Sequence, residues 1–176
     1  MEILESHNNW FRGKVDVTWD NGFKDLDYTR ESFNNPKDVE TWRRQGYSHD
    51  HFTGLLCDMR KPIPTWPFDI AQQLGWINVG VSFYRMETCN ILPSHRDTYK
   101  FYKQKYNIKD SNTIWRAVVF PEDWKPGHYI DIDGVGIVNW QAGEFIAWNN
   151  DVEHSACNVG LEPRYTVQIT GCKLDV

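Results

Sequence analysis

Residues 128–148 read HYIDIDGVGIVNWQAGEFIAW. An alternating apolar and polar segment ends at the turn Asp133-Gly134, and a second apolar segment ends at the turn Ala142-Gly143. A third segment, rich in aromatic and β-branched residues, closes the stretch at Trp148. Short strands separated by glycine turns are typical of an antiparallel β-sandwich or barrel. The stretch therefore predicts a mainly β fold.

Three more segments have the composition of strands: Trp76–Met86, Thr113–Phe120 and Arg164–Thr170. β-Branched and aromatic residues, which favour a pleated and half-buried surface, fill each of them. We therefore predict a β-rich core over residues 76–171. Residues 100–110, between two of its strands, are polar and aromatic, and we expect an inserted loop or a helical excursion there.

Residues 1–75 are less regular, and we expect mixed helical and extended segments that pack on the core. Residues 32–45 contain a helix with a proline near its first turn and Gly46 after its end. Three prolines make residues 61–67 an extended connector, and a second short helix is expected over 68–74. The aromatic residues of this part either form the core that seats it, which we favour, or line a substrate groove: Trp10, Phe11, Trp19, Tyr28, Trp42, Tyr47 and Trp66.

The composition of the chain favours one folded domain over residues 1–176, with 40% hydrophobic residues and a formal net charge of −5. An acidic balance makes sequence-independent binding to nucleic acid unlikely, although a local basic patch stays open. No apolar run reaches the ~18 residues of a membrane span, and no signal peptide is visible. We therefore expect no membrane partner, a cytoplasmic protein, and free thiols at the four cysteines.

Two histidines and one aspartate form the candidate metal site. His95 and Asp97 lie two positions apart in the segment ILPSHRDTY, and His154 lies downstream in DVEHSAC. Residues at i and i+2 on a strand point to the same face, so His95 and Asp97 can bind one ion from a single strand end. Two histidines and a carboxylate are the ligand set that holds non-haem Fe(II) in oxygenases, with positions left open for other ligands.

The other histidines of the chain are weaker candidates for metal ligands. The segment His49-Asp50-His51 has the same spacing but no strand pattern, so we interpret it as a solvated turn. His7 falls in the N-terminal segment, and His128 begins a strand without a visible partner. Taken alone, an H-x-D pair is more often structural than ligating, and the candidate site depends on further residues.

Arg164 strengthens the candidate site. It follows His154 by ten positions, and Thr166 follows two residues later on the same strand face. A permanently charged guanidinium beside a hydroxyl is suited to bind a carboxylate through two charge-assisted hydrogen bonds. The alternative is a surface arginine that pairs with an acidic side chain of the protein itself.

The chain resembles the 2-oxoglutarate and Fe(II)-dependent oxygenases. That family has a double-stranded β-helix (jelly-roll, cupin-like) core, an H-x-D…H triad, and an arginine with a serine or threonine two residues later; the matching residues are His95, Asp97, His154, Arg164 and Thr166. Segments 92–97, 115–119 and 154–155 are similar to the aspartyl/asparaginyl β-hydroxylase branch. That branch often lacks the carboxylate ligand, whereas Asp97 is present here. The resemblance covers roughly residues 76–171.

The resemblance implies a mainly β jelly-roll core with flanking helices and a hydroxylase that uses Fe(II), 2-oxoglutarate and O₂ on a substrate C–H bond. The metal ligands would be His95, Asp97 and His154, while Arg164 and Thr166 would bind 2-oxoglutarate. Tyr84 and Arg116 are secondary candidates for holding this co-substrate, and Trp148 is expected to pack near the site.

Two alternatives stay open. A cupin-like metal enzyme would use the same triad without 2-oxoglutarate, and a non-catalytic sandwich would hold the two histidines apart. The substrate is a protein side chain, a small metabolite or a modified nucleotide, and the branch that the chain resembles directs attention to an amino-acid side chain.

Overall fold

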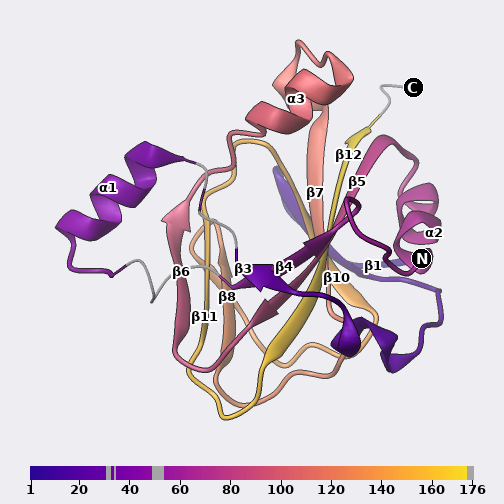
Figure 1. Cartoon of the computed structure of the whole chain (residues 1–176). Helices are drawn as coiled ribbons and strands as arrows, with labels where there is room; N and C mark the ends of the chain where they lie inside the picture. The colour runs from indigo at the N-terminus through magenta and orange to yellow at the C-terminus, as the bar shows by residue number, and fades with distance from the viewer. Residues whose placement is uncertain (31–32, 34, 49–53, 174–176) are drawn as a thin grey trace.

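The structure is a computed structural model that describes residues 1–30, 33, 35–48 and 54–173. Two antiparallel sheets form its core (Figure 1). Within the described residues, the larger sheet has eight strands in the order β1 (Glu2–Ser6), β2 (Trp10–Lys14), β10 (Glu144–Asn149), β7 (Ile114–Val119), β12 (Arg164–Lys173), β5 (Trp76–Met86), β4 (Leu55–Asp58) and β3 (Thr29–Arg30). The smaller has four, in the order β6 (Asn90–His95), β11 (His154–Asn158), β8 (His128–Ile132) and β9 (Val135–Ile137).

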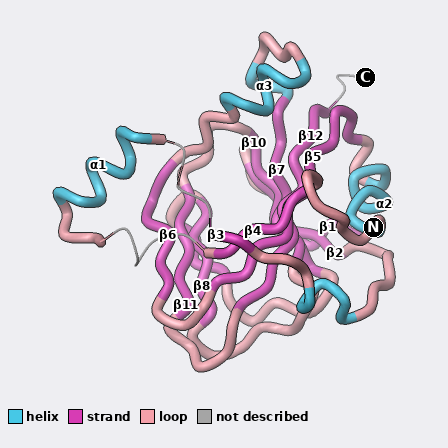
Figure 2. Tube along the Cα trace, viewed as in Figure 1, coloured by secondary structure: helices cyan, strands magenta, loops and turns pink. Residues whose placement is uncertain are grey.

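The path of the chain between the sheets is that of a jelly roll. From β5 onward the chain alternates between the larger sheet, which receives β5, β7, β10 and β12, and the smaller sheet, which receives β6, the β8–β9 hairpin and β11. This alternation is the double-stranded β-helix that the sequence predicted. The helices α1 (Pro36–Arg44), α2 (Trp66–Gln73) and α3 (Lys100–Tyr106) lie around the sheets, as Figure 2 shows.

The N-terminal part extends the larger sheet at both edges. Strands β1 and β2 continue it beyond β10, and β3 and β4 continue it beyond β5. These four strands were not predicted, because their short and irregular segments lack a clear alternation. The second helix begins at Trp66, so the predicted connector through Pro67 was too long. Proline has no backbone N–H, and the N–H groups of the first helical turn have no partner within the helix. Pro67 therefore fits in the first turn of α2.

Pleating divides the side chains of the larger sheet between two environments. One face packs against the N-terminal part, and its buried residues are Val81, Phe83, Ala117, Val119, Phe145, Ala147, Val167 and Ile169. Trp66 of α2 seals this face by stacking on Trp19 at 4.9 Å and meeting Phe83 edge-on at 5.7 Å between ring centroids. Most of the N-terminal aromatic residues therefore serve as core, as predicted. The opposite face turns toward the smaller sheet and lines the candidate site.

The structure contains the glycine turns and the free thiols that the sequence predicted. Gly46 ends α1 with a φ of +94°, and Gly134 and Gly143 also have positive φ, a region that favours glycine. Cys57, Cys89, Cys157 and Cys172 are free thiols. Among the helices of the described residues, none has the length and apolar character needed to cross a bilayer.

Candidate metal centre

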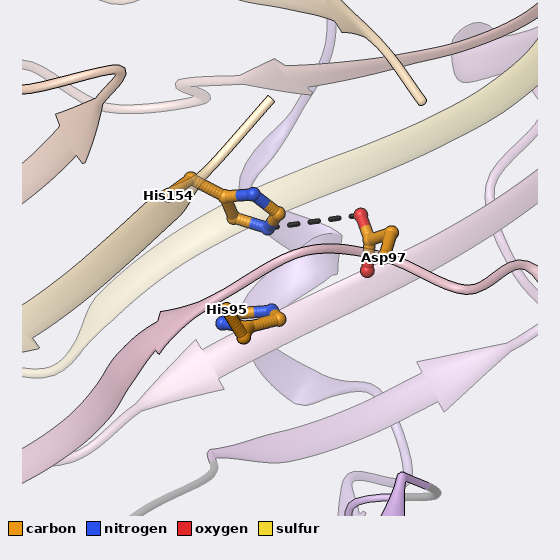
Figure 3. A group of neighbouring side chains, drawn as sticks. All are labelled: His95, Asp97 and His154. Carbon is orange, nitrogen blue, oxygen red and sulfur yellow. Dashed lines mark ion pairs between the residues drawn. The ribbon is translucent and has the colours of Figure 1, made fainter. Parts of the chain in front are cut away.

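The three predicted ligands meet at one end of the jelly roll. His95 ends β6 and His154 begins β11, and the two residues are direct partners in the register of the smaller sheet. Asp97 lies two residues beyond β6, and Figure 3 shows its carboxylate turned toward the imidazole of His154. The Nε2 of His154 is 3.6 Å from Oδ2 of Asp97, and the candidate ligand atoms of all three residues lie within 4.8 Å of one another. Within the described part of the chain, this is the one cluster of three or more such side chains close enough to share an ion.

Backbone carbonyl groups orient both imidazole rings. The Nδ1 of His95 is 2.8 Å from the carbonyl oxygen of Pro93, and the Nδ1 of His154 is 3.0 Å from that of Val152. A carbonyl oxygen only accepts, so in each neutral ring Nδ1 carries the proton and donates it. Nε2 therefore keeps its lone pair for a metal ion, which is the usual role of such a partner to a ligating histidine.

Burial keeps the two rings neutral. Desolvation, reinforced by the neighbouring His154, lowers the pKa of His95 to about 4, and desolvation also lowers the pKa of His154. Burial by itself raises the pKa of Asp97, but the opposing causes, of which the charge of Arg116 is the largest, hold that pKa below its ordinary value. At neutral pH the cluster therefore presents two neutral nitrogen ligands and one carboxylate, and no proton has to leave before a metal binds.

Aromatic side chains surround the histidines. Phe33 and Trp42 meet the ring of His95 edge-on at 5.0 and 5.9 Å between centroids, and Trp148 packs against His154 at 4.8 Å. Trp42 belongs to α1, and its indole Nε1 donates to the carbonyl oxygen of Ser94 at 3.3 Å. The position of Trp148 was expected, but nothing in the sequence placed Trp42 beside the metal ligands. These rings limit the access of water to the two imidazoles.

Arg116 lies against the aspartate ligand. Its Nη1 is 2.9 Å from Oδ2 of Asp97, and its guanidinium carbon lies 5.0 Å from the centre of the Tyr99 ring. The side chains of Arg116 and Asp97 are 20% and 13% exposed, so the ion pair is largely shielded from water. The arginine therefore fixes the position of a candidate metal ligand, a role that the sequence did not indicate. A contact of Arg116 with the co-substrate stays a prediction.

Arg164 is a buried cation without a carboxylate partner among the described residues. Its Nη1 donates to the carbonyl oxygens of Tyr129 at 2.7 Å and Cys157 at 3.3 Å, and its Nη2 contacts the sulfur of Met86 at 3.2 Å. Its Nε is buried and has no hydrogen-bond partner. Burial lowers the pKa of Arg164 to about 10, which still leaves it charged at neutral pH. A buried charge without a counter-ion is unfavourable, and an anion bound beside it relieves this cost.

Thr166 and Tyr84 lie next to this arginine. Thr166 is two residues further along β12 and buried, and Tyr84 is its direct partner on β5. The hydroxyl of Tyr84 accepts a hydrogen bond from the backbone N–H of Gly54, and burial raises its pKa to about 12. Thr166 and Tyr84 therefore add two neutral hydroxyl groups to the surroundings of Arg164.

A single cavity connects the metal ligands to the arginine. Its volume is about 990 Å³, and its lining includes all seven residues that the sequence singled out: Tyr84, His95, Asp97, Arg116, His154, Arg164 and Thr166. The described rival histidines, His7 and His128, do not contribute to this lining. His128 contacts the carbonyl oxygen of Glu162 at 3.0 Å and stacks on Trp140, which is a structural role. The segment His49-Asp50-His51 lies outside the described residues.

The comparisons with known proteins concern the fold. No protein-family model and no curated protein matches the chain. A prolyl-4-hydroxylase from Pseudomonas putida resembles it with a TM-score of 0.47 and 15% identity over 88% of this chain and 96% of that one. A cupin protein from Bacteroides fragilis has a TM-score of 0.42 and 12% identity over 86% and 89% of the two chains. A cupin barrel domain protein from Salinispora arenicola has a TM-score of 0.41 and 10% identity over 67% and 75%.

Proposed function

We propose that this protein is a non-haem Fe(II) oxygenase that uses 2-oxoglutarate and O₂ to hydroxylate a substrate C–H bond. The observation that carries the proposal is one cavity that contains both a His-Asp-His cluster and a buried arginine without a counter-ion. The first feature suits a divalent metal, and the second suits a carboxylate. A co-substrate with a metal-chelating end and a carboxylate at its other end matches both.

The donor set fits Fe(II). Two neutral imidazole nitrogens and one carboxylate oxygen provide three ligands on one side of an ion and leave the other positions free. Carbonyl partners already hold both imidazoles with Nε2 available, and Arg116 holds the carboxylate of Asp97. The chain therefore supplies the three ligands in an arrangement that is formed before the metal arrives.

The surroundings of Arg164 fit the distal carboxylate of 2-oxoglutarate. The unpartnered Nε points to unused hydrogen-bonding capacity, and Thr166 offers a hydroxyl on the same face. When bound, Fe(II) and 2-oxoglutarate supply the oxidation, in which one oxygen atom enters the substrate C–H bond and the other enters succinate with release of CO₂. The chain binds and orients these groups, and the aromatic residues around the histidines keep water out.

Succinate formation tests the proposal. Purified protein supplied with Fe(II), ascorbate and 2-oxoglutarate should release succinate, because the proposed reaction forms one succinate for each 2-oxoglutarate consumed. Asp97→Ala and His95→Gln should abolish this release, whereas the matched control His7→Gln, at an exposed position, should keep it. Equal succinate release by His95→Gln and His7→Gln would disprove the assignment of the triad.

One observation favours a second candidate, a cupin-like metal enzyme that does not use 2-oxoglutarate. The Nη1 atom of Arg164 is already occupied by the carbonyl oxygens of Tyr129 and Cys157, as in a structural arginine. Binding of Mn(II) to the triad without any succinate release or 2-oxoglutarate binding would support this candidate. Absence of Mn(II) binding would instead support a non-catalytic module.

The aspartyl/asparaginyl β-hydroxylase branch that the chain resembles makes an amino-acid side chain of a protein or peptide the first substrate class to test. Peptides that raise succinate release above the basal rate would identify it, with the added oxygen atom located by mass spectrometry.

A further inference from the structure

The segment around α3 is strongly basic within an acidic chain. Residues 98–109 read TYKFYKQKYNIK and contain four lysines without an acidic residue, whereas the whole chain has a net charge of −5. The segment begins directly after the metal ligand Asp97 and connects β6 to β7. It projects from one end of the jelly roll, above the ends of the large-sheet strands β7 and β12 (Figure 1).

Two tyrosines attach α3 to the barrel. The hydroxyl of Tyr102 donates to the carbonyl oxygen of Asn78 at 2.7 Å, and that of Tyr106 donates to the carbonyl oxygen of Val79 at 3.0 Å. These bonds hold the aromatic side of the helix on the edge of β5. The helix is therefore fixed next to the cavity, and its lysines are carried at a defined position.

The four lysines of this segment form no ion pair with a described acidic residue. Within the described residues, no carboxylate forms an ion pair with any of their ammonium groups; the lysines are Lys100, Lys103, Lys105 and Lys109. Elsewhere Lys24 pairs with Glu122 and Lys61 pairs with Asp27 at 2.8 Å. A group of neighbouring cations without counter-ions creates a positive potential that attracts anions.

Three of these lysines line a hollow next to the candidate active site. The hollow has a volume of about 580 Å³, and Lys100, Lys103 and Lys109 contribute to its lining, which contains no described acidic residue. Asn35, Thr98 and Lys100 line both this hollow and the cavity of the metal ligands. The two spaces therefore adjoin, and one molecule can occupy both.

The connection between the two spaces is short. Only Thr98 and Tyr99 separate Asp97 from Lys100 in the chain, so the Cα atoms of Asp97 and Lys100 are at most about 11 Å apart. The part of the hollow at Lys100 therefore lies close to the metal-ligand candidates.

We propose that the substrate carries an anionic group, a phosphate or a carboxylate, that binds in the hollow lined by Lys100, Lys103 and Lys109. The C–H bond to be oxidised then lies in the adjoining cavity, at His95, Asp97 and His154. The identification of this anion as part of a substrate rests on the proposed function. The anion site itself rests on the lysines, on their lack of acidic partners and on the shared lining of the two spaces.

Calorimetric titration of the metal-free protein with pyrophosphate and with citrate tests the site. Lys100→Gln combined with Lys109→Gln should weaken binding of the preferred anion about tenfold. The matched control Lys14→Gln combined with Lys24→Gln removes the same charge where β7 ends, whereas α3 precedes the start of that strand, and should change the affinity less than twofold. Tighter binding of pyrophosphate indicates a phosphate in the substrate, and tighter binding of citrate indicates a carboxylate.

Equal affinities of the two double variants would overturn the proposal, as would failure of the wild type to bind either anion. Should the first double variant fail to fold, Lys109→Glu, at an exposed position beyond the end of α3, tests the same hollow and should weaken binding more than Lys14→Glu. Succinate release by the wild type is measured separately. Equal anion affinities of the two double variants together with normal succinate release by the wild type would reject the anion site alone. Anion binding that depends on the lysines, without succinate release by the wild type, would reject the proposed oxygenase alone.

Discussion

Replacing Arg116 with methionine removes the cation that holds Asp97 in the metal-free protein. The two side chains are joined at 2.9 Å and are 20% and 13% exposed. Removing one partner of a buried ion pair costs about 3–5 kcal/mol. The remaining exposure screens part of this, so we expect Arg116→Met to lower the free energy of unfolding by about 2–3 kcal/mol. For a domain of this size, that change lowers Tm by about 5–10 °C.

A bound divalent ion should reduce this loss. The metal neutralises Asp97 in place of the arginine, and ligands that bind only the folded state add to its stability. Because Asp97 is the ion-pair partner of Arg116 and would also be a ligand of the metal, the Tm increase produced by Mn(II) should be several degrees larger in Arg116→Met than in the wild type. Thermal unfolding with and without Mn(II), followed by circular dichroism, measures both effects.

Arg12 provides the matched control for this experiment. Its Nε is 2.9 Å from Oε2 of Glu144, and their side chains are 21% and 9% exposed, so the pair is shielded to a similar degree. Arg12→Met should therefore lower Tm by a similar amount, but the loss should be the same with and without Mn(II). A loss in Arg116→Met that is also independent of Mn(II) would refute the idea that Arg116 acts through the charge of a metal ligand.

Three further predictions follow from the site and the fold. Arg164→Met should weaken 2-oxoglutarate binding at least 30-fold, as expected for loss of ~2–5 kcal/mol at a buried charge pair, while calorimetry shows Mn(II) affinity changed less than twofold. The free energy of unfolding of the metal-free wild type should fall by about 3 kcal/mol between pH 6.5 and pH 4. His95 takes up a proton over this range in the unfolded chain, whereas in the folded protein its pKa is about 4. Urea unfolding of His95→Gln should show a flatter pH dependence. Gly127→Ala should lower Tm much more than Gly134→Ala, since both have positive φ but an added Cβ at Gly127 would come 2.2 Å from the backbone nitrogen of Gly160, whereas Gly134 has open space around it.

Local patterns predict the strands of the jelly roll well. The strand predicted over Trp76–Met86 has the bounds of β5, and the predicted start at Arg164 is the first residue of β12. In both strands, successive side chains enter two different buried environments. β-Branched and aromatic residues are therefore frequent in them. β2 and β4 escaped prediction because each is stabilised by pairing with a strand that is not its neighbour in a hairpin, β10 and β5 respectively. Such pairing leaves little trace in five or fewer residues.

The candidate site was predictable to the extent that its residues have fixed spacing. His95 and Asp97 share a strand end, and the distance from His154 to Arg164 reflects one strand, a turn and the start of the next strand. The contact of Arg116 with Asp97 depends on the placement of β7 in the other sheet, so no local pattern reveals it. The same holds for Trp42, which α1 brings to His95 from more than fifty residues away.

The position of α3 has a consequence for how such a protein can change in evolution. The chain leaves the barrel just after the metal ligand Asp97 and returns to it at Ile114. Beyond Tyr99, whose ring lies against Arg116, the connection contributes none of the residues proposed to bind the metal or the co-substrate. Its length and charge can therefore vary without a change in the His-Asp-His cluster, and under the proposed function exchange of this single connection would redirect the same metal centre to a new class of molecule.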